Sequence, residues 1–172
     1  VALAEEADAP SPRRAIVIAT VNPRASTAIE NLLREHDAAL QEWGIYLVGR
    51  DLDLPLQGRL DPEAVTGQDR ILAAIAAYDT MKQACVVVDA GTAITVDFVD
   101  GEGVFHGGAI APGLRMSLKA LHEHTAALPE IEFRKPDADA TFGRNTTQAM
   151  YQGVYHAARG LVRALAERYA EA

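Results

Sequence analysis

The chain has 172 residues, with 16 Lys or Arg and 24 Asp or Glu, and its formal net charge is −8. This balance excludes a general nucleic-acid binder, which needs a basic face, and disfavours docking on an anionic membrane. Apolar residues make up 49 %, enough for a core, and the single cysteine, Cys85, excludes an intrachain disulfide framework. Because no apolar run approaches ~20 residues and the start is acidic, we expect a cytoplasmic protein without nucleic-acid or membrane partners.

The first half of the chain predicts alternating strands and helices. A β-branched apolar run marks a buried strand, and Asn22-Pro23 precedes a helix in which Thr27 and Glu30 have the spacing of a capping box. A long loop with two prolines and two glycines follows, and such loops inside a domain are often functional. In chain order we predict a flexible start over 1–14, a strand over 15–20, a helix after 22, a strand over 45–48, a loop over 51–67 and a helix over 71–78.

The second half predicts three strands followed by two helices. Ala84–Asp89 has the composition of a buried strand that ends in a carboxylate, and Asp100–Gly103 is a turn signal between two further strands. Small residues along the last helix would let another helix approach closely. In chain order we predict strands over 84–89, 93–99 and 104–110, a helix from 114 to 121, a loop over 128–140 and a helix over 147–169.

The sharpest motif is Asp89–Thr95, DAGTAIT, which lies between the first of these strands and the hairpin. A carboxylate at a strand end points to the mouth of an α/β fold, where metals and phosphates bind. Gly91 lets the backbone approach a phosphate, and Thr92 offers a hydroxyl and an amide to its oxygens. The alternative is a turn in which Asp89 caps backbone amides. The flanking strand and hairpin favour the phosphate-binding interpretation.

A second motif, Gly67-Gln68-Asp69-Arg70, directly precedes an apolar helix. The helix dipole and the neighbouring guanidinium both favour an ionised Asp69. Such a carboxylate can orient a hydroxyl and take its proton late in a loose phosphoryl transfer, and Arg70 can hold an anionic or polar group of the substrate. The alternative is a helix cap with an incidental arginine.

Two further segments are rich in glycine or capping residues. The run Gly107–Leu114, which begins with Gly107 and Gly108, indicates either close backbone approach to a ligand or a tight turn. Gly143–Thr147 begins the last helix, and its free amides can bind an anion or a polar substrate there. An ordinary N-cap at this helix start is an equally good interpretation.

Taken together and in this order, the motifs resemble the type III pantothenate kinase family, within the superfamily of acetate and sugar kinases, Hsc70 and actin. The resemblance runs from about Ala15 to about Arg168. Each pattern alone is weak, whereas five in the family order are specific. The matches are GxDR at 67–70, DxGTAxTxD at 89–97, GGxIxPGL at 107–114, TAxLP at 125–129 and GxxT at 143–146.

The resemblance implies an α/β fold of the actin-like (ribonuclease H-like) kinase type. It also implies ATP-dependent phosphorylation of pantothenate, the first step of coenzyme A synthesis, by a homodimer that uses Mg²⁺ and a monovalent cation, K⁺ or NH₄⁺. Asp69 would be the general base and Asp89 the ligand of the monovalent cation. The implied contacts to pantothenate are Gly67, Gln68, Asp69, Arg70 and Thr146, and the expected nucleotide-binding residues are Gly91, Thr92, Gly107 and Gly108.

The chain departs from the family pattern at both ends. Family members begin with a strand ending in DxGNT, which cradles the ATP phosphates, and continue to a TGG motif after the long helix, and neither occurs in the 172 residues. We therefore expect an incomplete first lobe over 15–82 with the substrate loop, and a second lobe over 83–172 with the phosphate-binding hairpin and the long helix. Two alternatives stay open: a non-catalytic ligand-binding or dimerisation module, and a related kinase or phosphatase that acts on a sugar or an acyl phosphate.

Overall fold

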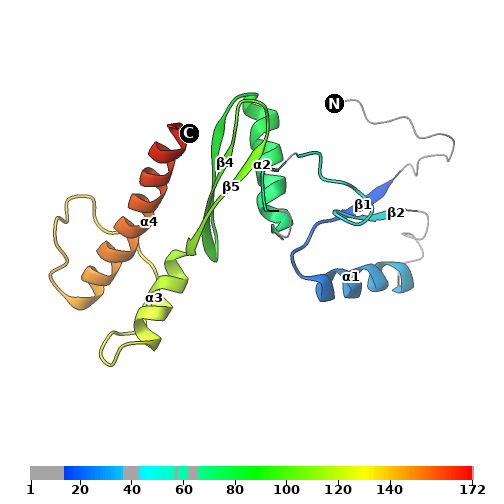
Figure 1. Cartoon of the computed structure of the whole chain (residues 1–172). Coiled ribbons are helices and arrows are strands. Elements are labelled where there is room, and N and C mark those ends of the chain that lie inside the picture. Colours follow the sequence, from blue (N-terminus) through cyan, green and yellow to red (C-terminus); the bar gives the residue numbers. More distant parts are fainter. Residues whose placement is uncertain (1–13, 37–42, 57, 62–65, 172) are drawn as a thin grey trace. The chain divides into compact units, whose positions relative to one another are not determined.

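The computed structural model forms two compact units (Figure 1). Unit 1 comprises Val1–Pro55 and Thr66–Asp69, and unit 2 comprises Leu56–Val65 and Arg70–Ala172. The structure describes residues 14–36, 43–56, 58–61 and 66–171. The predicted flexible start over 1–14 therefore lies, apart from Arg14, outside the described residues.

Unit 1 is built on a β-α-β crossover. Strand β1 (Ala15–Ile18) and strand β2 (Gly44–Leu47) are parallel, with Ala15 opposite Gly44, and helix α1 (Pro23–His36) lies between them in the chain. The two strands and the helix confirm the predicted elements. The prediction that the first strand is buried is wrong, since Val17 is 57 % exposed. The described strands form a two-stranded sheet, which leaves part of each strand uncovered.

Helix α1 begins at a different cap from the predicted one. The side-chain Oδ1 of Asn22 accepts hydrogen bonds from the backbone amides of Arg24 (3.1 Å) and Ala25 (3.2 Å), so Asn22 is the N-cap. The capping box assigned to Thr27 and Glu30 is wrong, because both residues lie inside the helix. A helix that starts with proline after an Asn cap has the preferred pattern at its first position.

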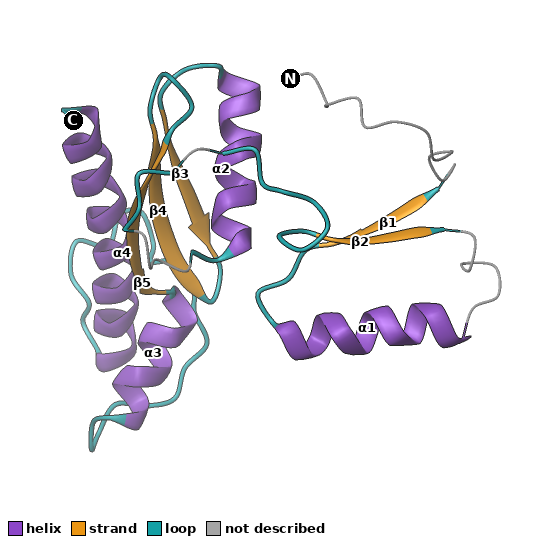
Figure 2. Cartoon of the chain, turned by 45° about the vertical axis from the view of Figure 1, so that its right-hand side comes forward, coloured by secondary structure: helices purple, strands orange, loops and turns teal. Residues whose placement is uncertain are grey.

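Unit 2 contains an antiparallel sheet with the strand order β3-β4-β5. Helices α2 and α4 lie on opposite sides of this sheet (Figure 2). The predicted strands and helices are all present. Their bounds are α2 Gln68–Met81, β3 Cys85–Ala90, β4 Ala93–Val99, β5 Phe105–Pro112, α3 Leu114–Glu123 and α4 Thr146–Ala170. Strand β3 is less buried than predicted, with Val88 44 % exposed, because it is an edge strand of the described sheet.

Two apolar clusters hold unit 2 together. On one side of the sheet, Ala74 of α2 packs with Val99 and Phe105. The second cluster joins α3 to α4 through Leu118, Met150 and Val154. The first cluster fixes α2 against the sheet, and the second fixes the two helices that follow it. Among the described helices, none is long and apolar enough to cross a membrane.

Candidate functional site

One face of the sheet in unit 2 carries both acidic residues of the DxGTAxTxD segment. In the β3–β4 register, Val87 lies opposite Asp97 and Asp89 lies opposite Thr95. Directly opposed residues share a face, and alternate residues of a strand return to it. Asp89 and Asp97 therefore share the face on which α2 packs, since Val87 joins the cluster around Ala74. As diagonal neighbours on adjacent strands they are about 7–8 Å apart.

The tight turn between β3 and β4 presents Gly91 and Thr92 at the surface. The Gly91 amide donates to the Ala93 carbonyl at 2.9 Å, and the Gly113 amide donates to the Thr92 carbonyl at 3.0 Å. A Cβ on Gly113 would overlap the carbonyls of both turn residues, so glycine there allows the close approach of α3's start to the turn. Thr92 is exposed, and a Cβ on Gly91 would meet no atom closer than 4.0 Å. The turn is open to a ligand.

A hollow of about 810 Å³ borders this turn. Gly91 and Thr92 line it from the hairpin, and Arg115 and Lys119 line it from α3. A threonine hydroxyl, exposed backbone and two cations suit a phosphorylated ligand. Gly107 and Gly108 line a different hollow, of about 900 Å³, with Arg168 and Tyr169 of α4. The four residues expected to bind the nucleotide therefore line two different hollows and do not form one group.

Asp89 is an exposed carboxylate at the end of β3. In the part of the chain that the structure describes, no three His, Cys, Asp or Glu side chains gather into a metal site. The single carboxylate of Asp89 fits a hard cation that takes its other oxygen ligands from backbone, water or ligand phosphates.

The segment Gly67–Arg70 forms the start of α2. Asp69 is exposed in the first turn, where the helix dipole favours a carboxylate. A Cβ on Gly67 would overlap the Asp69 carboxylate oxygen Oδ1, so glycine leaves room for that side chain. Gln68 donates from Nε2 to the Val48 carbonyl at 2.8 Å, a bond within unit 1. Gln68 is therefore held within unit 1, and the Asp69 carboxylate lies at the surface.

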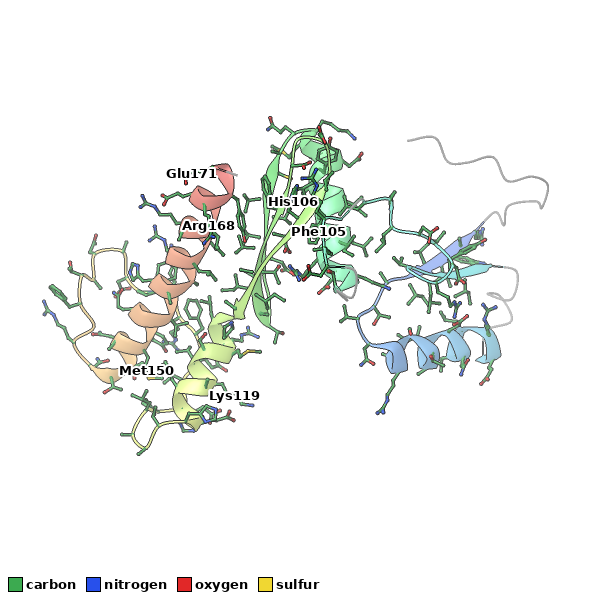
Figure 3. All side chains as sticks on the ribbon, viewed as in Figure 1. Phe105, His106, Lys119, Met150, Arg168 and Glu171 are labelled. Atoms are coloured by element: carbon green, nitrogen blue, oxygen red, sulfur yellow. The ribbon has the colours of Figure 1, made fainter. Side chains whose placement is uncertain are left out.

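Arg70 makes the most buried polar contact of the site. Its Nε donates to Oδ2 of Asp97 at 3.0 Å, and its Nη2 donates to Oδ1 of the same carboxylate. The guanidinium also lies 5.9 Å from the ring centroid of Phe105. Figure 3 labels Phe105 on β5. Sequence reasoning gave Asp97 no role. The available signal was a carboxylate within the apolar strand AITVDFV, which requires a cationic partner.

Thr146 is the first residue of α4 and is exposed. The N-cap is Asn145, whose side chain accepts from the Gln148 amide at 2.8 Å. Thr146 does not line the hollow beside Thr92. Asn145 therefore caps α4, and the side chain of Thr146 is exposed next to the cap.

Asp100, in the turn between β4 and β5, accepts from His106 Nε2 at 2.7 Å and from the amides of Glu102 and Val104 at 2.9 Å. The bond to His106, followed by that to Val104, lowers the pKa of Asp100. Burial raises the pKa of the Cys85 thiol, and Cys85 packs against the cluster around Val99, so it is a core residue.

The chain is similar to known proteins over most of its length. The family profile described as type III pantothenate kinase matches residues 1–168. A type III pantothenate kinase of Ruegeria pomeroyi is 45 % identical over 123 residues, which are 71 % of this chain and 47 % of that protein. One from Geotalea uraniireducens is 35 % identical over 153 residues, covering 89 % of this chain and 57 % of that protein. The chain spans about half the length of these curated relatives.

A solved structure has the same fold over most of the chain. It is described as a Baf family transcriptional activator from Campylobacter jejuni, with a TM-score of 0.59 and 24 % identity. The match covers 89 % of this chain and 64 % of that one. At this identity the likeness concerns the fold.

Proposed function

This chain belongs to the type III pantothenate kinase family, which has the actin-like ATPase fold, and from that premise we propose that it takes part in ATP-dependent phosphorylation of pantothenate to 4'-phosphopantothenate, the first step of coenzyme A synthesis. One observation carries the proposal beyond the likeness itself. Arg70 of the GxDR segment is bonded to Asp97, on the sheet face that also carries Asp89 of the DxGT segment. Two family motifs whose nearest residues, Arg70 and Asp89, are 19 apart in sequence are thus linked through one face of one sheet.

The proposed chemistry assigns one task to each side chain. Asp69 orients the primary hydroxyl of pantothenate and accepts its proton late in the transfer, as suits a loose transition state. Gly67, Gln68, Arg70 and Thr146 contact pantothenate, and the exposed Gly91-Thr92 turn contacts the phosphates. Asp89 holds the monovalent cation. Mg²⁺ and that cation, when bound, neutralise charge on the phosphoryl oxygens.

Further parts of the proposal come from the family likeness. They are a first lobe over 15–82, a second lobe over 83–172, nucleotide contacts from Gly107 and Gly108, a cytoplasmic location and a homodimer. Exposed small residues on α4, among them Gly153 and Gly160, are compatible with the close approach of a helix from a second copy. Sedimentation equilibrium tests the dimer, which Gly160→Glu should weaken.

The test is ADP release by the 172-residue chain with pantothenate, a hexose or acetate as the acceptor. Of the three acceptors, we expect only pantothenate to be phosphorylated, at a rate that K⁺ or NH₄⁺ increases. Asp89→Asn should raise the K⁺ concentration needed for half-maximal rate, whereas Asp137→Asn, an exposed carboxylate in the loop before α4, should not. Turnover with a sugar or acetate and none with pantothenate would assign the chain to another activity of the superfamily.

A second candidate is a ligand-binding or dimerisation module without turnover. The observation that favours it is that Gly91 and Thr92 line one hollow while Gly107 and Gly108 line another, so the four expected nucleotide contacts do not share one site. Titration calorimetry with pantothenate separates the two functions. Binding of pantothenate together with no ADP release would establish the module.

A further inference from the structure

Asp97 has an environment unlike that of the other carboxylates the structure describes. Asp97 is 1 % exposed, and of the acidic side chains that the structure describes it is the one that is buried. Removing a carboxylate from water is costly unless a cation and good hydrogen-bond geometry compensate it. Arg70 supplies both, through two parallel N–H···O bonds. The pair is therefore a specific structural element of unit 2.

The two bonds fix the orientation of the guanidinium as well as its place. A planar guanidinium bound through Nε and Nη2 cannot rotate without losing a bond. Phe105, which is fully buried, provides an aromatic contact for the same group at 5.9 Å. Arg70 is the third residue of α2, directly after Asp69. Fixing Arg70 therefore fixes the first turn of the helix that carries the proposed base.

Gly108 makes room for this pair. It lies opposite Asp97 in the β4–β5 register, and a Cβ there would overlap the Val96 carbonyl oxygen and crowd Oδ1 of Asp97. A side chain would therefore displace the carboxylate that binds Arg70. This gives the second glycine of the GGxIxPGL segment a structural purpose that local sequence reasoning did not supply.

We propose that Asp97 is a positioning residue for the phosphorylation of pantothenate: it anchors Arg70 to β4, and through Arg70 it sets the first turn of α2, with Gly108 as the space that permits it. The inference rests on the proposed function. Asp97 touches no substrate and acts through Arg70. A displaced first turn misplaces Asp69 and the pantothenate contacts, and leaves the Gly91-Thr92 turn unaffected.

The kinetic test uses Asp97→Asn, which keeps the size of the side chain and loses one acceptor and its charge. We expect kcat/KM for pantothenate to fall by about 10-fold to 100-fold, as for a misplacement of reacting groups, while KM for ATP changes by less than twofold. The control is Asp137→Asn, an exposed carboxylate in the loop before α4 that should leave both constants unchanged. Unchanged pantothenate kinetics in folded Asp97→Asn protein would overturn the proposal.

A double-mutant cycle separates positioning from a general loss of stability. Arg70→Lys keeps a cation beside the buried carboxylate and loses the two-bond geometry, so it should fold and show the same selective loss. In that background Asp97→Asn should add less than twofold, because its effect passes through Arg70. Independent, multiplying effects would contradict the proposal. If Asp97→Asn alone does not fold, unchanged pantothenate kinetics in Arg70→Lys would contradict it equally.

Hydrogen exchange distinguishes failure of this inference from failure of the proposed function. The amides of Leu72, Ala73 and Ala74 close the first turn of α2 and report on it without any turnover. We expect faster exchange at these amides in Asp97→Asn and no change in Asp137→Asn. If wild-type protein neither binds nor phosphorylates pantothenate but this exchange result holds, the proposed function fails and the anchoring of α2 stands. Unchanged exchange would refute the anchoring itself.

Discussion

The two units differ in whether a charged pair lies inside the protein. In unit 1, Glu30 accepts hydrogen bonds from Arg34 and Arg50, and Arg50 also bonds Asp51, with the arginines about half exposed. Unit 2 has exposed pairs as well, and in addition Asp97 and Arg70 form a pair inside the protein. The apolar residues differ likewise: among the described residues, the buried hydrophobic side chain of unit 1 is Ile45, whereas unit 2 has two clusters.

The contrast concerns two different contributions to stability, ion pairing and apolar packing. The bonds from Arg50 and then Arg34 lower the pKa of Glu30 to about 2, and Arg50 also lowers the pKa of Asp51. Exposed pairs of this kind contribute little to folding and are screened by salt. Apolar burial of the kind around Phe105 contributes several kcal/mol per large side chain. We therefore expect packing to dominate the stability of unit 2, and these exposed pairs to give unit 1 a small dependence on pH and salt.

The largest expected effect is that of Phe105→Ala. The ring is fully buried against Ala74 and Val99, so its removal should cost about 3–5 kcal/mol of folding free energy. Urea unfolding can be followed by circular dichroism, which reports mainly α2, α3 and α4, and by fluorescence of Trp43, the one tryptophan, in unit 1. The circular dichroism midpoint should fall well below that of wild type, with a smaller shift at Trp43. Equal shifts would show that the two units unfold together.

We expect Asp100 to make a smaller contribution to folding stability, which acid should remove. Its pKa is lowered in the folded state, so its bonds to His106 and the turn amides stabilise unit 2 above the ordinary Asp pKa of about 3.9. That contribution is lost as the pH falls through the folded-state pKa. Asp100→Asn should therefore flatten the decline of the circular dichroism melting temperature below pH 4. An acid decline as steep as that of wild type would contradict this role.

The smallest effect should come from Arg50→Gln, which removes two bonds to Glu30. The pKa of Glu30 should rise from about 2 towards its ordinary value, so less stabilisation is lost between pH 4.5 and pH 2. The Trp43 midpoint should fall slightly at low salt, and the difference should vanish in 1 M NaCl, where the Debye length is about 3 Å. A difference that persists in high salt would indicate packing by Arg50 instead of charge.

Most helices and strands could be predicted, because apolar spacing and turn residues are read from a few neighbouring positions in the sequence. The spacing of Met150, Val154 and Leu161 predicted a helix over 147–169, and α4 is Thr146–Ala170. The turn signal at Asp100–Gly103 predicted the β4–β5 connection. The cap of α1 was misassigned because two capping patterns overlap, and Asn22, next to Pro23, is the one that accepts amide bonds.

Burial and long-range pairing were less predictable. The runs AIVIAT (15–20) and ACVVVD (84–89) predicted buried strands. Burial depends on which neighbours cover a strand, and β1 and β3 are both partly exposed in the described sheets. The bond between Arg70 and Asp97 joins residues 27 apart and depends on the packing of α2 on β4. Local sequence placed Arg70 beside Asp69 but did not identify the carboxylate that orients it.

The central claim is that Asp69 is the base for transfer of the ATP γ-phosphoryl group to pantothenate. Its most direct test is ³¹P NMR of ATP and pantothenate with wild type, Asp69→Asn and Asp79→Asn, the last being an exposed carboxylate near the end of the same helix. We predict a phosphomonoester signal with wild type and Asp79→Asn, and a rate lower by about 10²–10⁴-fold with Asp69→Asn. Phosphopantothenate formed by Asp69→Asn at the wild-type rate would contradict the claim.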